Sequence, residues 1–422
     1  MKKVETPAKV KLIISCQACG SKNLYKFINF GPMPKPNIYL TRKEALEYGL
    51  PTFQLDASLC TDCGLVQLGE IVPSEELFAE NYAYRTPEAM RPDFRESAQE
   101  TASIAGIKEG ASALEIGSNI GICLDEYRKI GMKVLGVDPA TIYAKQANKA
   151  GIETIIKPFT SELADSIVRE KGKMDIVTAA NVLQHIPDLV GTIDGIRKVL
   201  APNGVFSLEF PYLGDILNNT DFDTFYAEHY YYLSLGPLQK IFESMGMTMV
   251  HAKRLPLIHN GSMRIFVKHG RGSTEMSREL WSMIKDEKEN GFLDPKRFSN
   301  FKARVDNIVH QINMHLYVAK ARGEQIVAHG SSAKFVTLTN YMHIGEDVIS
   351  YVADSTEVKQ GKVTPGMGIP VVSEEQLLKD APDVVFCGIR NFYDQNKAKY
   401  DKIKKSNPKA KILIPIPEVS YR

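Results

Sequence analysis

Hydrophobic and polar positions alternate in blocks between residues 110 and 270. Short apolar runs of strand length are separated by amphipathic segments that suit helices. The apolar runs are 112–116, 133–138, 174–183 and 204–212, and the helical segments are 123–131, 143–151 and 190–200. This alternation is typical of a parallel sheet with helices on both faces. A further helix is predicted over 234–247, with Ser234 as its N-cap, followed by an antiparallel strand pair at 248–255 and 262–269.

Two other patterns flank this block. The first 75 residues contain short apolar stretches with turn chemistry, and three prolines between positions 32 and 36 exclude a helix there and favour an extended connector. Residues 273–322 are polar and helical, and a second strand–helix alternation begins at 325. We therefore predict an α/β protein in three parts: a small cysteine-bearing module (1–75), a central Rossmann-like domain (76–270) and a C-terminal Rossmann-like α/β domain (271–422).

Composition narrows the class of protein. The 422 residues are 44% hydrophobic and 24% charged, with a net charge of +2, as expected for a globular protein. So small a charge produces no global field that recruits nucleic acid or acidic lipid. The sequence contains no apolar run long enough to span a membrane and no signal-peptide pattern. We expect a cytoplasmic protein without nucleic-acid or membrane partners. Because no heptad seam stands out, we expect a monomer or a weak homo-oligomer.

Four of the six cysteines form two matched pairs. Cys16 and Cys19 are one C-x2-C motif, and Cys60 and Cys63 are another, 40 residues further along. Each pair ends in glycine, which allows a tight turn whose N–H groups point at the thiolates. Four thiolates close a tetrahedral zinc site that has no open position, so we predict a structural Zn²⁺ that stabilises a small module. The alternatives are a redox pair, or cysteines without a joint role.

A glycine-rich turn, ALEIGSNIG at 113–121, follows the first strand of the central block. Gly117 and Gly121 let the backbone approach a ligand at a helix N-terminus, and Asp138 ends the next strand, where an acid can accept ribose hydroxyls. The spacing E-x-G-x-x-x-G, together with the closing antiparallel pair, favours S-adenosylmethionine (SAM) over NAD; a turn without a ligand is the other alternative. The predicted cofactor-binding residues are Glu115, Gly117, Ser118, Asn119, Gly121, Asp138 and Asn181.

Two segments after later strands carry candidate acid–base residues. His185 lies in NVLQHIPD (181–188), where a side chain can face the ligand crevice, although it can equally pack against a helix. Glu228 and His229 lie in FYAEHYYYLS (225–234), which follows the strand predicted at 204–212. An imidazole has a pKa near neutrality and suits proton abstraction, and Tyr226 is able to donate to a developing oxyanion. The competing interpretation of this segment is an aromatic core loop.

The chain resembles the zinc-containing, SAM-dependent C-methyltransferases that act on nucleotide-linked 4-keto-6-deoxysugars. The similarity keeps its order over nearly the whole chain. It includes the cysteine module, LEIGSNIG, NVLQHIPD, and the C-terminal segments AKFVTLTNYMHIG and VKQGKVTPGMGIPV. Its most specific part is FDTFYAEH at 222–229, where the family reads Phe-Asp-Thr-x-Tyr-His-Glu-His. The resemblance implies a central class I SAM methyltransferase domain and a C-terminal domain that contributes to nucleotide-sugar binding.

The resemblance also implies roles for individual residues. The family's catalytic base falls on His229, and its supporting residues fall on Tyr226, Glu228 and His185. A tyrosine after the zinc module falls on Tyr82, in preference to Tyr84. In the implied reaction the ketone acidifies a neighbouring C–H bond, His229 removes that proton, and the enolate takes the methyl group of SAM.

The sequence departs from the family pattern at four places. Ala227 replaces a histidine, Ile120 replaces an acid, NGS at 260–262 replaces Gly-Gly-Ser, and Phe335 replaces a glycine. We expect SAM binding to survive Ile120. Ala227 and Phe335 fall where the sugar and the nucleotide should be recognised, and Phe335 is expected to crowd a phosphate, so the chain is a divergent member. The rival hypotheses are O- or N-methylation of another small molecule, and a SAM- or nucleotide-binding protein without turnover.

Overall fold

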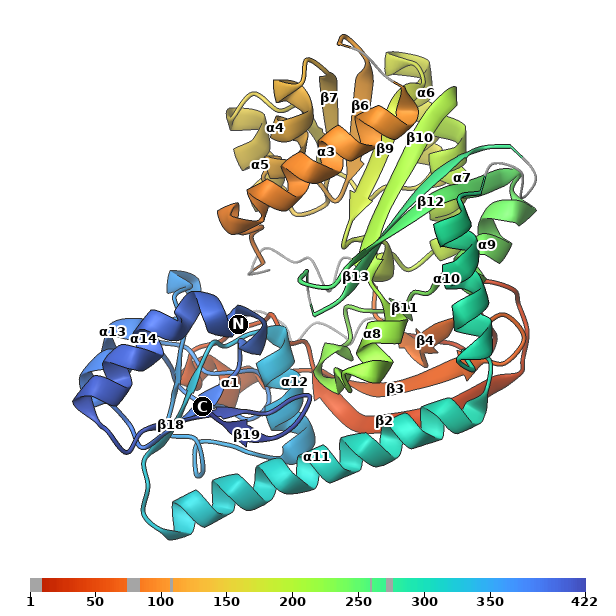
Figure 1. The fold of residues 1–422 in the computed structure, drawn as a ribbon. Coiled ribbons are helices and arrows are strands. Elements are labelled where there is room, and N and C mark those ends of the chain that lie inside the picture. Colours follow the sequence, from red (N-terminus) through yellow and green to blue (C-terminus); the bar gives the residue numbers. More distant parts are fainter. Residues whose placement is uncertain (1–9, 74–83, 107–108, 259, 271–275) are drawn as a thin grey trace.

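The computed structural model describes residues 10–73, 84–106, 109–258, 260–270 and 276–422. Within these residues the chain forms three larger sheets, one in each part of the sequence pattern (Figure 1). One hydrophobic cluster continues through all three parts, from Phe27 through Leu208 to Phe335. The predicted α/β class is therefore correct, and the three parts share a core.

The N-terminal sheet is antiparallel and includes one strand from the central part of the chain. Its order is β11–β4–β3–β2, with β2 at Leu24–Pro34, β3 at Thr52–Cys60, β4 at Val66–Leu68 and β11 at Tyr231–Tyr232. β1 (Lys11–Leu12) pairs with β5 (Glu70–Ile71), and α1 covers Arg42–Tyr48. The proline-rich segment is extended, as predicted, but its first residues belong to β2. A strand at the edge of a sheet tolerates prolines that a central strand excludes.

The central sheet has seven strands in the order β12–β13–β10–β9–β6–β7–β8. The parallel strands are β6 (Ser112–Ile116), β7 (Lys133–Val137), β8 (Thr154–Ile155), β9 (Met174–Ala180) and β10 (Leu200–Pro211). β12 (Met247–Leu255) and β13 (Ser262–His269) form the predicted antiparallel pair. The order in which strands are added to the sheet reverses between β6 and β9: β7 and β8 lie on one side of β6, and β9 and β10 lie on the other. This switch creates a crevice at the carboxyl ends of β6 and β9.

Helices cover both faces of this sheet (Figure 1). α3 (Arg91–Ala105), α4 (Ile122–Lys129) and α5 (Thr141–Lys149) lie on one face. α6 (Ser161–Lys171) and α7 (Leu189–Val199) lie on the other. The 3-10 turns η1 (Glu88–Met90) and η2 (Leu183–His185) precede α3 and α7. Apolar residues of both layers pack against the strands, so the sheet is buried on both sides.

The segment after β10 leads from the sheet to the N-terminal module. It contains α8 (Leu213–Asn218), the 3-10 turn η3 (Phe222–Thr224), β11 and α9 (Leu235–Ser244). Ser234 is the N-cap residue of α9, as predicted, but its side chain makes no capping hydrogen bond. The Glu287 carboxylate accepts from the N–H groups of Leu235 and Gly236 at 2.7 and 2.8 Å instead. A carboxylate suits this position because it also complements the helix dipole.

Two helices connect the central part to the C-terminal part. α10 (Arg278–Glu289) packs against α9 and β12. α11 (Pro295–Ala321) is 27 residues long and crosses the molecule beneath β2 (Figure 1). Its buried face includes Phe298 and Phe301, which contact Phe27 of β2 at ring-centroid distances of 4.9 and 6.1 Å. The polar helical pattern at 273–322 thus corresponds to a helix pair, of which the second packs on the N-terminal sheet.

The C-terminal sheet has the order β16–β15–β14–β17–β18–β19 and is parallel except for β19. Its strands are β14 (Ile326–His329), β15 (Val352–Ala353), β16 (Val371–Val372), β17 (Val384–Cys387), β18 (Lys411–Ile414) and β19 (Ser420–Tyr421). The helices are α12 (Ala333–Met342), α13 (Glu374–Asp380) and α14 (Tyr393–Ser406), with short turns η5 (Glu357–Lys359) and η6 (Arg390–Phe392). The predicted second Rossmann-like alternation is therefore present.

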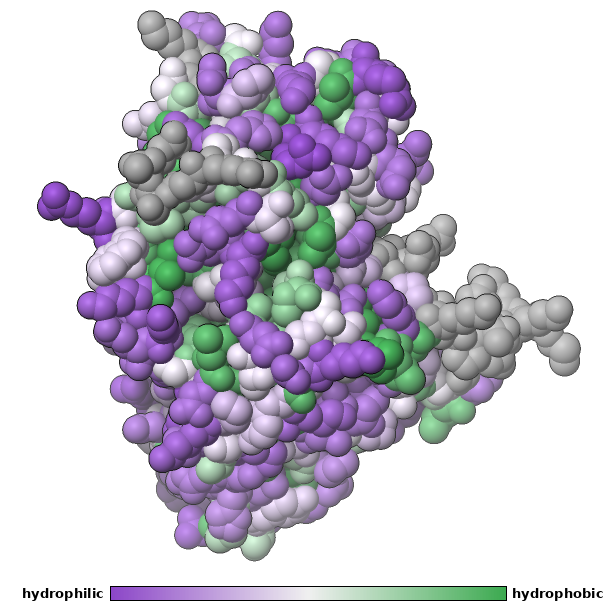
Figure 2. Space-filling view, turned by 90° about the vertical axis from the view of Figure 1, so that its right-hand side faces the viewer, coloured by the Kyte–Doolittle hydropathy of each residue, from purple (hydrophilic) through white to green (hydrophobic). Residues whose placement is uncertain are grey.

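The surface is mixed in character. Figure 2 shows the face that lies on the right of Figure 1, where hydrophobic residues form small groups among hydrophilic ones. Across the described residues, no helix combines the length and the apolar character that crossing a membrane requires.

Candidate functional site

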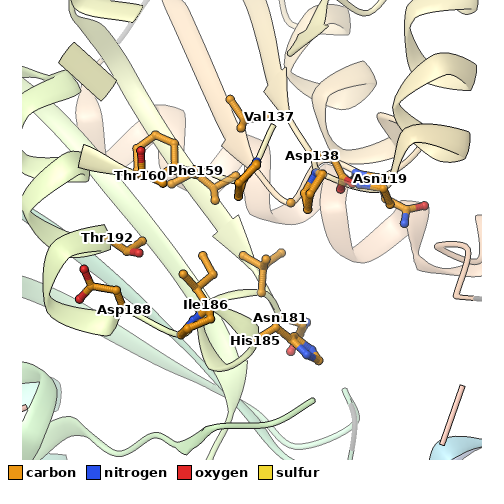
Figure 3. Close-up of a pocket in the computed structure, with 18 of the residues that line it drawn as sticks. Asn119, Val137, Asp138, Phe159, Thr160, Asn181, His185, Ile186, Asp188 and Thr192 are labelled. Carbon is orange, nitrogen blue, oxygen red and sulfur yellow. Dashed lines mark hydrogen bonds between the residues drawn. The ribbon is translucent and has the colours of Figure 1, made fainter. Parts of the chain in front are cut away.

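A cavity of about 420 Å³ opens at the carboxyl ends of β6, β7 and β9 (Figure 3). Four of the predicted cofactor-binding residues line it, and so does His185: they are Gly117, Asn119, Asp138, Asn181 and His185. The other predicted residues, Glu115, Ser118 and Gly121, are not among its described lining residues, and Glu115 and Ser118 are buried. The cavity occupies the position where open α/β sheets bind ligands.

The glycine-rich turn has the backbone that its sequence indicates. Gly117 and Gly121 have φ angles of +72° and +82°, and Asn119 has +48°. A Cβ atom on Gly117 would lie 2.5 Å from Cγ2 of Val182, which also lines the cavity. Any side chain at this position would therefore be strained and would displace the wall of the cavity.

Asp138 supports the turn from the neighbouring strand. Its Oδ2 accepts from the Asn119 N–H at 2.8 Å, and its Oδ1 accepts from the Ala140 N–H at 2.7 Å. Burial raises the pKa of Asp138, although these two N–H groups lower it. Each carboxylate oxygen keeps a second lone pair, so Asp138 is able to accept ligand hydroxyls while it holds the turn.

Asn181 contributes a buried acceptor to the same cavity. Its Nδ2 donates to Glu209 Oε1 at 3.2 Å, and Glu209 pairs with the fully buried Arg264 at 2.9 Å. Arg264 also contacts Glu100 of α3 at 2.7 Å. Oδ1 of Asn181 is buried and has no hydrogen-bond partner among the residues that the structure describes. An unpartnered buried oxygen on a cavity wall fits a bound polar ligand such as the SAM predicted from the turn.

Several lining residues were not predicted from the sequence. Phe159, Thr160, Asp188 and Thr192 line the side of the cavity that α6 and α7 border (Figure 3). Thr86 lies near the start of α3 and donates its N–H to Asn119 Oδ1 at 3.0 Å. Asp188 ends the segment NVLQHIPD, in which only Asn181 and His185 were predicted to bind or react. The other residues belong to helix ends and loops without a motif, so no local pattern distinguished them.

Two of the hydrogen bonds that the described residues make hold the ring of His229, in the loop after η3. Its Nδ1 lies 3.0 Å from the Thr224 carbonyl oxygen, and its Nε2 lies 2.8 Å from the Tyr226 hydroxyl. A carbonyl oxygen only accepts, so Nδ1 carries the proton and Nε2 accepts from Tyr226. The ring is thus held in the tautomer that presents a basic Nε2.

His185 stands between His229 and the cofactor cavity. The two imidazole rings meet edge to face, with centroids 4.7 Å apart, and His185 lines the cavity (Figure 3). Burial lowers the pKa of His185 to about 4, so its ring is neutral near pH 7. The structure therefore brings together three of the predicted catalytic residues: His185, Tyr226 and His229.

Glu228 points to a different partner from its neighbour His229. Both of its carboxylate oxygens lie 2.9 Å from Nδ2 of Asn37, which follows β2. Burial raises the pKa of Glu228 to about 7, although the Asn37 amide and the charge of Lys35 lower it. The side chains of the adjacent residues 228 and 229 thus contact different parts of the protein. The remaining predicted catalytic residue, Tyr82, lies outside the described residues, whereas Tyr84 lines the cofactor cavity.

The four paired cysteines converge in the N-terminal module. The Sγ atoms of Cys16 and Cys63 are 3.5 Å apart, those of Cys19 and Cys60 are 3.6 Å apart, and all four lie within 4.8 Å of one another. A tetrahedral zinc with Zn–S bonds of about 2.3 Å requires sulfur separations of about 3.8 Å. The N–H groups of Ala18 and Leu65 point at Cys16 and Cys63 at 3.4 Å, as predicted for glycine-ended turns. The donor set and its spacing fit a closed zinc site.

Comparison with known proteins agrees with this geometry. Three family models match in chain order: a putative zinc-binding domain at residues 16–78, a methyltransferase domain at 86–252 and a C-methyltransferase C-terminal domain at 257–417. C-methyltransferase NovU of Streptomyces niveus is 31% identical over 376 residues, which cover 89% of each chain. The chain belongs to this C-methyltransferase family. It is a SAM-dependent methyltransferase, and zinc is its second cofactor.

More distant matches cover only part of this C-methyltransferase. A ubiquinone biosynthesis O-methyltransferase of Actinobacillus pleuropneumoniae is 28% identical over 102 residues, 23% of this chain and 44% of that one. Among solved structures, SAM-bound magnesium protoporphyrin IX methyltransferase ChlM of Synechocystis matches with a TM-score of 0.34 and 14% identity. That match covers 43% of this chain and 79% of ChlM.

Residues that depart from the family pattern have clear positions in the C-methyltransferase. Ile120 packs in the cluster around Phe94 and Ile122, outside the described cavity lining. Ala227 is buried within the loop that carries His229, residues 225–234. Phe335 is fully buried, with its ring 5.8 Å from that of Phe386 in β17. The Phe335 ring therefore belongs to the core of the C-terminal sheet.

Proposed function

We propose that this C-methyltransferase adds the methyl group of SAM to a carbon next to the ketone of a nucleotide-linked keto-deoxysugar. The observation that carries the proposal is the contact between Nδ1 of His229 and the Thr224 carbonyl oxygen, 3.0 Å apart. Because a carbonyl oxygen only accepts, the neutral ring carries its proton on Nδ1, and Nε2 is the basic nitrogen. The similarity of segment 222–229 to the sugar C-methyltransferases supports the substrate class. In this proposal the C-terminal α/β domain contributes to nucleotide binding.

His229 acts as the general base. A C–H bond next to a ketone is acidic enough for an imidazole because the resulting charge spreads onto the carbonyl oxygen. Nε2 takes the proton, the C–H electron pair becomes the enolate, and the enolate carbon forms the new C–C bond. SAM supplies the electrophilic methyl group and leaves as S-adenosylhomocysteine.

Two neighbours keep the base effective. Burial raises the pKa of Tyr226 well above its ordinary value, so its phenol stays protonated. In the structure its O–H donates to Nε2 of His229, so this hydrogen bond has to open before Nε2 takes the substrate proton, and the phenol can then donate to the developing oxyanion. His185 is neutral near pH 7 because burial lowers its pKa to about 4. A neutral ring at this position neither competes for the substrate proton nor repels a sulfonium in the adjacent cavity.

The zinc site supports the chemistry without taking part in it. Cys16, Cys19, Cys60 and Cys63 would fill all four coordination positions, so no position remains for substrate. The zinc would hold the ends of β3 and the turns around it, and through them the module that carries Asn37.

Hydrogen exchange tests this function directly. In deuterated buffer, with 4-keto-6-deoxysugars linked to dTDP, GDP or CDP as probes, the wild type should exchange the proton on the carbon next to the ketone. His229→Ala should slow this exchange by roughly 10²-fold or more, the usual contribution of a general base. SAM affinity, measured by calorimetry, should not change.

His310→Ala is the matched control, because His310 is an exposed histidine on α11. It should exchange at the wild-type rate. Methylation of an oxygen or nitrogen acceptor, without exchange on any keto-sugar, would contradict the proposal and favour the O- or N-methylation alternative.

A further inference from the structure

A buried arginine of the C-terminal part contacts the turn η3, directly before the loop that carries His229. Arg390 lies in η6, just after β17, and its side chain is only 6% exposed. Its Nη2 lies 2.6 Å from Asp221 Oδ1 and 3.0 Å from Asp223 Oδ1, and its Nη1 also contacts Asp223 Oδ2. The two carboxylates are 4% and 0% exposed. An arginine with two carboxylates and little water is a strong, directional contact.

This cluster is built to hold a turn and does not have the character of an anion site. Both guanidinium Nη atoms point at carboxylates, and Lys334 Nζ stands 3.9 Å from Asp223. Two carboxylates balance the two basic groups. Arg390 also borders a cavity of about 730 Å³, but its charge is already matched by Asp221 and Asp223, so it offers little attraction to a phosphate there.

The held turn is the one that orients the base. Asp221 is the residue at the N-cap position of η3, without a capping hydrogen bond from its side chain, and Asp223 lies inside η3, directly before Thr224. Within the turn, the Thr224 N–H donates to the Asp221 carbonyl and the Phe225 N–H donates to the Phe222 carbonyl, each at 3.2 Å. The Thr224 carbonyl accepts from Nδ1 of His229 at 3.0 Å. The position of this carbonyl therefore depends on the turn, and the turn depends on Arg390.

We infer that Arg390 is a positioning residue that fixes the tautomer and orientation of His229 through Asp223 and Thr224. The C-terminal domain thereby contributes to proton abstraction as well as to substrate binding. The inference rests on the proposed role of His229 as the base. A hydrogen-bonding partner on one imidazole nitrogen determines which nitrogen is basic, so loss of the Thr224 contact removes the basic Nε2 from part of the population.

The test uses two variants of the full-length, zinc-containing protein. Arg390→Met removes the guanidinium, and Asp223→Asn keeps the shape of the side chain and the Arg390–Asp221 pair. Nitrogen-15 NMR of the imidazole rings, with His229→Ala to assign the signals, reports which nitrogen of His229 carries the proton. The wild type should show a protonated Nδ1, and both variants should show a growing population protonated at Nε2. Exchange of the keto-sugar proton should slow by about 10²-fold, the usual cost of a misplaced catalytic group, while SAM affinity is unchanged.

Lys399→Met is the control, since it breaks a different ion pair of the C-terminal domain, to Glu374 at 2.7 Å. It should change neither the imidazole signals nor the exchange rate. If Arg390→Met does not fold, the NMR spectrum of Asp223→Asn alone tests the inference. Unchanged His229 nitrogen signals in Asp223→Asn overturn the inference, even where exchange slows, because the effect would then not pass through His229. The NMR measurement needs no substrate. It therefore tests the effect of Arg390 on the tautomer of His229 separately from the proposed reaction.

Discussion

Glu228 and His229 are neighbours in sequence but serve different parts of the site. His229 contacts Thr224 and Tyr226 within its own loop, whereas Glu228 contacts Asn37 of the zinc-binding module. The Glu228 carboxyl group is buried and has a pKa near 7, so it changes charge in the physiological range. Protonation of Glu228 therefore affects the junction between the module and the loop.

The pH dependence of stability should reveal this group. The pKa of Glu228 rises from an ordinary value of 4.5 to about 7 on folding, so the folded state retains a proton that the unfolded state has lost. The stabilisation is complete below pH 4.5 and is lost as the pH rises through 7. Over this window the wild type should lose up to about 3 kcal/mol of unfolding free energy relative to Glu228→Gln.

Urea unfolding at a series of pH values measures the difference. Glu170→Gln, on the exposed side of α6, is the control and should follow the wild type. If the unfolding free energies of the wild type and Glu228→Gln change in parallel with pH between 4.5 and 7, Glu228 is ionised in the folded protein over this range and the prediction is wrong.

The sequence allowed some site residues to be predicted and not others. His229, Tyr226 and His185 lie in segments with recognisable patterns, and Asp138 follows a predicted strand. Asn37 and Arg390 lie 191 and 167 residues from the acids they contact, in segments without a motif of their own. Only the folded chain brings such residues together, because a single sequence carries no information about which distant polar groups pair.

At the scale of elements, the glycine-rich turn is the feature on which cofactor binding depends. Gly117→Ala should weaken SAM binding by at least about 10-fold, because a methyl group there adds steric strain at a positive φ and pushes Val182 into the cavity. Calorimetric titration with SAM measures the change.

Gly106→Ala is a matched control for backbone strain. Gly106 ends α3 with a φ of +62°, and no atom lies within 4 Å of its added Cβ. This variant should lose about 1 kcal/mol of stability and keep its SAM affinity. If Gly117→Ala binds SAM as tightly as Gly106→Ala, the turn does not hold the cofactor.

The strands and helices were predictable because their periodicity is local. The four parallel strands that the apolar pattern predicted in the central sheet are present, and so are the antiparallel pair and the helix pair. The two-residue strand β8 was not predicted, because it is too short to show a pattern. Capping was less predictable: Ser234 occupies the N-cap of α9, but Glu287, 53 positions away in the chain, satisfies the N–H groups. A side chain from another element can provide the same hydrogen bonds with an additional charge, and local sequence does not reveal it.

At the scale of the whole molecule, the zinc-binding module contacts the loop that carries the proposed base. β11 of this loop pairs with β4 of the module, Asn37 contacts Glu228, and Tyr39 donates to the Ser331 carbonyl of the C-terminal domain at 2.6 Å. The module therefore contacts both α/β domains, and we expect its order to affect the proposed reaction although the metal lies away from it.

Removal of zinc should abolish exchange of the keto-sugar proton and lower the thermal stability, because a structural zinc contributes directly to folding. Cys60→Ser should have the same effect. Elemental analysis, calorimetry with SAM and the exchange assay measure the outcome. Cys123→Ser alters a buried cysteine outside the cluster and should retain one zinc per chain. A zinc-free protein with full exchange activity would show that the module does not support the site.

The helix α11 has a consequence for how substrate enters and leaves. At 1.5 Å per residue it is about 40 Å long, and its apolar side is packed on β2 and reaches β14 at its far end. A hinge requires residues that can change their backbone angles, and an unbroken, packed helix contains none. α11 therefore provides no hinge within its own length. We expect substrate exchange to proceed through movement of loops, without bending of this helix.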